Sequence, residues 1–159
     1  MNKLKNQKGF TLIEILVVLG IIAILATIVL IAINPARQFR QARDTQRTSN
    51  VNAILNAIGQ YIADTKGSIP AGIDDVVASN QALSNTGANI CSLLVPKYIS
   101  ALPADPKATG VAADGQISES ECAGAHDTLY EVNKDANGRI TIYADGEEPS
   151  GTNNISVTR

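Results

Sequence analysis

Tryptophan is absent from this chain of 159 residues, and its aromatic side chains are limited to two phenylalanines and four tyrosines. Stacking surfaces for bases or sugars would therefore have few rings to use. The single histidine, His126, excludes a multi-histidine metal site and leaves one imidazole for catalysis. Two cysteines allow at most one intramolecular disulfide. The formal charge of −2 is too balanced for a protein that binds nucleic-acid phosphates.

Charge is also almost missing from residues 10–33, FTLIEILVVLGIIAILATIVLIAI, where Glu14 is the only ionisable side chain. As a helix this segment would be about 36 Å long, enough to cross a hydrocarbon layer of about 30 Å. A secretory signal has a shorter apolar core of about 7–15 residues. A buried core helix would need more surrounding protein than the rest of the chain supplies. The segment therefore predicts a membrane-inserted helix. The leader in front of it, residues 1–9, contains no acid and three lysines: Lys3, Lys5 and Lys8.

Glu14 is the informative residue of this segment, because a carboxylate inside an apolar span costs a few kcal/mol on insertion. One explanation is its position near the start of the span, from which it reaches the headgroup layer. The other is a charged partner. The residues in front of it, KGFTLIE at positions 8–14, resemble the processing signal of type IV pilins and of the pseudopilins of type II secretion systems.

This resemblance implies that a membrane-embedded aspartic peptidase cuts between Gly9 and Phe10 on the cytoplasmic side, and that the new terminus at Phe10 is N-methylated. The α-amine of Phe10 would then be a cation close to the Glu14 carboxylate, and pairing offsets much of the cost of each charge in hydrocarbon. The pair can form within one molecule, where the helix dipole also favours Glu14, or between neighbours. The resemblance implies the second arrangement, which fixes the axial stagger of adjacent subunits.

A second helical segment, residues 34–66, is predicted after the apolar span, and it begins at Asn34-Pro35. Asn is a good N-cap and Pro suits the first helical position, so a second helix starts here or one helix continues with a kink. Gly67 and Pro70 supply the stop signal. One apolar stripe at helical spacing predicts packing on a head domain, and it comprises Val51, Ile54, Leu55, Ile58, Tyr61 and Ile62.

Four arginines follow the apolar span at close to helical spacing: Arg37, Arg40, Arg43 and Arg47. They fall within about 120° of one helix face. One interpretation is a solvated face that touches lipid phosphates. The other is contact with the acidic heads of neighbouring subunits, since residues 67–159 carry five basic and twelve acidic side chains.

The head, residues 67–159, is predicted to be small and antiparallel. Residues 67–87 are rich in Gly, Asn, Ser and Asp and are interpreted as a loop, and residues 90–106 resemble a connecting loop of major pseudopilins. Alternation at 128–133 and 139–144 around the turn string 134–138 predicts a hairpin, and 155–158 is a candidate edge strand. The predicted fold class is therefore α+β: a long helix, first transmembrane and then amphipathic, packed on a small sheet as in a ladle-shaped type IV pilin.

Cys91 and Cys122 are either bridged, which would place the head in an oxidising compartment, or two free thiols. The string Asn133-x-Asp135-x-Asn137-Gly138 begins like a calcium loop, but position twelve is Ala144, so a hairpin turn is the better interpretation. His126-Asp127 is interpreted as a surface pair because no nucleophile motif accompanies it. The resemblance also suggests a second hypothesis, that the head binds calcium. The candidate ligands are Asp114, Glu119, Glu121, Asp127, Asp145, Glu147 and Glu148.

These observations predict a non-enzymatic filament subunit with no required cofactor and no metal site, processed at Gly9-Phe10 and assembled through its N-terminal helix. The filament would be a type IV pilus, a secretion pseudopilus or a DNA-uptake fibre. The expected partners are other copies of the chain, related minor subunits, a prepilin peptidase and methyltransferase, an inner-membrane assembly platform and the membrane. The N-terminus would be cytoplasmic and the head extracytoplasmic. The alternative is a single-span membrane-anchored binding domain that does not polymerise.

Overall fold

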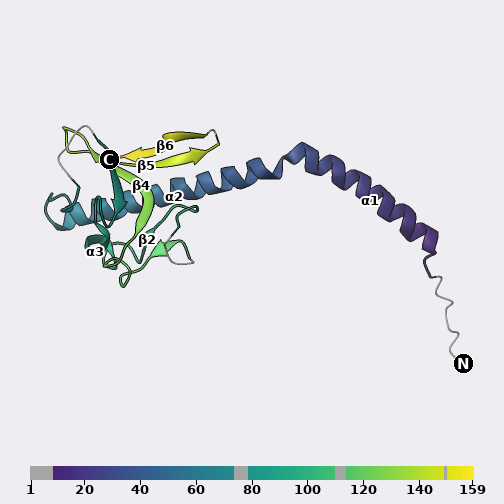
Figure 1. Cartoon of the computed structure of the whole chain (residues 1–159), viewed down its shortest axis with the longest axis horizontal. Coiled ribbons are helices and arrows are strands. Elements are labelled where there is room, and N and C mark those ends of the chain that lie inside the picture. Colours follow the sequence, from purple (N-terminus) through teal and green to yellow (C-terminus); the bar gives the residue numbers. More distant parts are fainter. Residues whose placement is uncertain (1–8, 74–78, 110–113, 149) are drawn as a thin grey trace, which may run out of the picture. The chain divides into compact units, whose positions relative to one another are not determined.

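A computed structural model describes residues 9–73, 79–109, 114–148 and 150–159. The chain divides into two units, Met1–Phe39 and Arg40–Arg159. Apart from Gly9, the predicted leader lies outside the described residues. The first unit contains helix α1, Leu12–Ile33, and the start of helix α2, Pro35–Asp64. The second contains the rest of α2 and all the strands (Figure 1).

Helix α1 has 22 residues, and none of its side chains is buried. Its mean hydropathy of 3.3 over an 18-residue window makes it long and apolar enough to cross a membrane. The helix ends at Asn34, which adopts the left-handed conformation with φ 48° and ψ 76°. Asn34 Oδ1 then accepts a hydrogen bond of 3.3 Å from the Arg37 amide, and Pro35 occupies the first position of α2. The alternative in which a second helix starts at this point is confirmed.

The second unit packs around the later part of α2. The predicted stripe is confirmed, because Val51, Ile54, Leu55 and Ile58 are at most 2% exposed and Tyr61 and Ile62 pack against the same core. The helix ends where Gly67, with φ 98°, donates its amide to the Ile62 carbonyl at 2.8 Å. A side chain at that φ would be strained, which explains why glycine stops the helix.

The main sheet is antiparallel in the order β1-β4-β5-β6. Its strands are β1 Gln81–Ser84, β4 Asp127–Lys134, β5 Ile140–Glu147 and β6 Ser150–Thr158. The predicted hairpin is confirmed as β4 and β5, and the predicted edge strand is the end of β6. The interpretation of residues 67–87 as loop was wrong for 81–84, which form β1 because pairing with β4 outweighs a weak local preference. Strands β2, Leu102–Pro103, and β3, Gln116–Ile117, form a second small sheet.

A disulfide joins Cys91 to Cys122, with the two Cα atoms 5.4 Å apart. Cys91 opens the short helix α3, Cys91–Leu94, and both cysteines belong to the core. The alternative of two free thiols was therefore wrong. With its long helices and small antiparallel sheets, the protein has the α+β, pilin-like fold that was expected.

Candidate functional site

The start of α1 is built around a capping box between Thr11 and Glu14. Glu14 Oε2 accepts hydrogen bonds of 2.9 Å from both the amide and the hydroxyl of Thr11. In return, the Glu14 amide donates to Thr11 Oγ1 at 3.3 Å. Two of the amides that a helix N-terminus leaves without a partner are satisfied in this way. The carboxylate is therefore turned back along the chain toward Thr11.

The peptide bond between Gly9 and Phe10 lies just outside this cap. Both residues are exposed and precede the helix, and the Phe10 side chain is 85% exposed. A peptidase needs an accessible, non-helical segment, and this part of the chain offers one. In the sequence analysis, Glu14 was considered with the headgroup layer, the helix dipole and the Phe10 amine, and Thr11 was missed. The signal was present, because Thr-x-x-Glu before an apolar run is the pattern of a capping box.

A second cluster of charged side chains lies in the head, where Arg47 of α2 is only 2% exposed. Its guanidinium donates to both oxygens of Asp105, Nε at 2.5 Å and Nη2 at 2.9 Å. Nη1 donates to Asp44 and to Glu147, both at 2.7 Å. Because a planar guanidinium presents five N–H groups in a fixed fork, one arginine can hold three carboxylates in this geometry.

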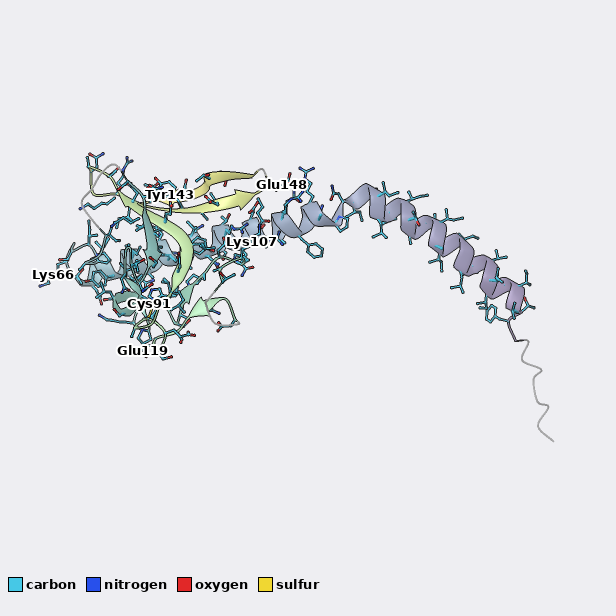
Figure 2. The ribbon with its side chains drawn as sticks, in the orientation of Figure 1. Lys66, Cys91, Lys107, Glu119, Tyr143 and Glu148 are labelled. Carbon is cyan, nitrogen blue, oxygen red and sulfur yellow. A yellow bond between two sulfur atoms is a disulfide. The ribbon has the colours of Figure 1, made fainter. Side chains whose placement is uncertain are left out.

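The same cluster fastens the turn between β5 and β6 to α2. The Asp44 carboxylate accepts the amides of Glu147, at 3.0 Å, and Glu148, at 2.8 Å. Arg43 forms a two-point contact with Glu147 at 2.7 and 2.6 Å. Lys107 Nζ adds a third cation 2.8 Å from Glu147, and Figure 2 shows Lys107 and Glu148 at the same end of the head. A cavity of about 650 Å³ opens beside these groups.

The titration of these groups follows from their partners. The Arg43 guanidinium, with Lys107 and Arg47, holds the pKa of Glu147 well below its ordinary value despite the opposing effect of burial. Burial alone would raise the pKa of Asp44, but the hydrogen bonds that it accepts hold the pKa below its ordinary value. Burial raises the pKa of the neighbouring Tyr130 phenol to about 12. The carboxylates of Glu147 and Asp44 therefore stay ionised into the acid range.

These contacts give three of the four arginines a role that was not predicted from the sequence. Arg43 and Arg47 bind carboxylates of their own head, and Arg40 Nε lies 3.0 Å from Glu148 Oε2. For these three arginines the acidic partners are therefore in the same head, which neither interpretation anticipated. The physical reason is tertiary, since the β5–β6 turn returns to the helix face that carries the arginines. Helical spacing alone does not reveal such a return.

The remaining candidates in the head have structural partners. His126 is 6% exposed, and its Nδ1 lies 3.0 Å from the Gly124 carbonyl oxygen, so the expected surface pair with Asp127 was wrong. Asp135 Oδ1 accepts the amides of Asn137, at 2.9 Å, and Arg139, at 2.8 Å, which confirms the hairpin-turn interpretation of that string. In the described part of the chain, no three His, Cys, Asp or Glu side chains gather into a group that could hold a metal ion.

Residues 4–30 match the family model of the prokaryotic N-terminal methylation motif. The chain carries a prepilin-type signal. The methylation motif includes Gly9, Phe10, Thr11 and Glu14 and most of α1, so it covers the capping box and the exposed bond described above. It ends before α2 and the head. No curated protein and no solved structure matches the chain.

Proposed function

We propose that this protein is the precursor of a structural subunit of a type IV pilus-like or type II secretion pseudopilus filament. The observation that carries the proposal is the placement of Glu14. It is the only ionisable side chain in an otherwise mostly apolar span, and it lies within the methylation motif shortly after the Gly9-Phe10 bond. An ionised carboxylate in that position costs free energy in the membrane unless a charged partner in the assembly offsets it.

In this proposal, cleavage between Gly9 and Phe10 changes the chemistry of the helix start. Before cleavage, the lysines of the leader are strongly hydrated and hold the chain at the cytoplasmic headgroups. After cleavage, the new amine of Phe10 is a cation beside Thr11, whose amide and hydroxyl hold the Glu14 carboxylate. An incoming subunit then presents its Glu14 to the Phe10 amine of a neighbour, which sets one axial stagger among helices that are otherwise apolar and free to slide.

The proposed partners follow from this sequence of events. A prepilin peptidase cuts the leader, and a methyltransferase modifies Phe10. An inner-membrane assembly platform and further subunits receive the processed chain. The N-terminus is cytoplasmic and the head is extracytoplasmic, an orientation supported by the disulfide between Cys91 and Cys122, since disulfides persist in oxidising compartments.

The first test is the mass of the mature N-terminus in a host that carries a prepilin peptidase. The proposal expects a species that begins at N-methylated Phe10. An intact Met1 would contradict it and favour the single-span binding domain that does not polymerise.

The second test replaces Glu14 with Ala and measures both processing and filament yield. We expect cleavage to remain close to normal and filament yield to fall at least about tenfold, because one unpaired ammonium in an apolar bundle costs several kcal/mol. Thr27→Ala is the matched control. Thr27 is a polar side chain farther along the same span, but its hydroxyl is satisfied by the Ala23 carbonyl of its own helix at 2.9 Å. Normal filament yield from Glu14→Ala would refute the assembly role.

A further inference from the structure

The main sheet of the head has two edges with different surroundings. At the β1 edge, the loop that follows the strand folds back, and the Ala88 amide donates to the Ala82 carbonyl at 2.8 Å. Gly87 lies so close that a Cβ there would be 2.3 Å from the Ala82 oxygen. This edge is therefore covered by its own chain. At the other edge, no strand of the described ranges pairs with the outer side of β6 (Figure 1).

The pairing of β6 with β5 shows which backbone groups turn outward. Arg159 exchanges both hydrogen bonds with Ile140, at 2.7 and 2.9 Å. In an antiparallel pair, such bonded residues alternate with residues whose N–H and C=O groups face the other way. The register continues without a shift from Thr158 to Ile155. The backbone groups of Ser156 and Thr158 therefore face the open edge, whereas those of Val157 face β5.

This edge lacks the usual protection against pairing. Residues 150–158, SGTNNISVT, contain no charged side chain and no proline, although edge strands of monomeric proteins commonly carry one or the other. Ile155 and Val157 pack against the core and yet stay only partly buried. A strand added at this edge would cover the exposed part of both side chains.

We propose that the outer edge of β6 is an interaction surface that pairs antiparallel with β6 of a second copy of this chain, about a two-fold axis through Ser156. The order of side chains along β6 favours a second copy of the same strand as the partner. With the axis at Ser156, the outward N–H of this residue donates to the C=O of the partner's Ser156, and the partner's N–H donates back to its C=O. Ile155 then faces the partner's Val157, so that apolar side chains lie opposite each other on the core face and hydroxyl groups on the solvent face.

The contact goes beyond the proposed filament role, because an isologous two-fold contact closes on itself and joins only two heads. It uses neither Phe10 nor Glu14. Pairing of one short strand is weak for two free molecules, but confinement in a membrane or along a fibre raises the effective concentration of the heads. The expected result is a head-to-head link between two subunits in the membrane or between two fibres.

The test is disulfide cross-linking of the full chain, with the leader intact, in lipid vesicles that contain no other protein. Ser156→Cys places two thiols across the axis, at the Cα separation of about 5.5 Å that an opposed bonded pair has and a disulfide accepts. Mild oxidation should give a dimer on a non-reducing gel. Thr158→Cys is the matched control, because its thiols would lie four residues apart along the strands, roughly 13 Å, which no disulfide can bridge. We expect about ten times more dimer from Ser156→Cys.

A second variant tests the backbone contact itself. Thr158→Pro, added to Ser156→Cys, removes an outward N–H that β5 does not use, so the sheet is retained while the dimer yield should fall severalfold. Equal yields from Ser156→Cys and Thr158→Cys would show random collision and overturn the proposal, as would a lack of dimer from Ser156→Cys. Glu14→Ala combined with Ser156→Cys should still cross-link, so a failure of the filament role is distinguishable from a failure of strand pairing.

Discussion

Arg47 shows how much one side chain can determine in the head. Its guanidinium is buried, with Asp105, Asp44 and Glu147 as partners, and these come from three separate segments of the chain. Replacing one member of a buried ion cluster leaves the others with uncompensated charge. The sequence shows the arginine as the last of four at close to helical spacing, but it does not show that the side chain is buried. Nothing in the local pattern separates it from Arg37 at the start of the series.

Arg47→Met should lower the free energy of unfolding of the head by about 3–5 kcal/mol, because three carboxylates lose their shared cation. The measurement is urea unfolding of the full chain in detergent, followed by tyrosine fluorescence. Arg139→Met is the control, since the Arg139 side chain is 62% exposed and pairs with Asp135 in its own turn. Exposed pairs contribute about 0–1 kcal/mol. Equal losses from the two variants would contradict the central role of Arg47.

Glu147 should make the stability of the head depend on pH in the acid range. Its pKa in the folded protein lies well below the ordinary value of 4.5. The folded state therefore binds this proton more weakly than the unfolded chain does, and the stabilisation is complete above about pH 4.5 and is lost as the pH falls toward the folded pKa.

Glu147→Gln should lower the urea midpoint at pH 7 and reduce the further loss between pH 4.5 and pH 3. Glu119→Gln, which changes an exposed carboxylate outside the cluster, should reproduce the wild-type pH profile. If the two variants gave the same profile, Glu147 would not be the source of the acid sensitivity.

At the scale of elements, those set by local sequence signals were predictable, whereas those set by tertiary pairing were not. The break at Asn34-Pro35, the stop at Gly67 and the hairpin turn around Asp135 were predictable because each depends on backbone chemistry within a few residues. Strand β1 was not, because its four residues have a weak preference of their own and become a strand only beside β4. The capping box at Thr11 was predictable from Thr-x-x-Glu but was missed in the sequence analysis.

The prediction at the scale of elements concerns the contribution of the disulfide to stability. It joins helix α3 to the segment at Cys122 across a sequence separation of 31 residues. Cys91→Ala with Cys122→Ala should cost about 3–4 kcal/mol of stability by loop entropy. A reducing agent should lower the wild-type protein to the same urea midpoint and leave the double variant unchanged. A double variant as stable as the oxidised wild type would show that the core holds these elements without the bridge.

At the scale of the molecule, the two units have separate chemistry. The first unit contains the processing bond, Thr11, Glu14 and a helix with no buried side chain. The second contains the core, the disulfide and the ion cluster. For this reason each variant affects one property: Glu14→Ala affects filament assembly, Arg47→Met affects the stability of the head, and Ser156→Cys reports contact between heads. Each variant changes a group whose described partners lie within one unit.

The sequence by itself determined the apolar span, its lone carboxylate, the processing motif, the amphipathic stripe and the hairpin, because each is written in neighbouring residues or in a short period. Only the tertiary structure decided that Arg47 is buried, that Cys91 meets Cys122, that β1 joins the sheet and that β6 is left at an open edge. These features depend on which distant segments meet, and the free energy that selects those contacts is shared across the whole core rather than held in any local pattern.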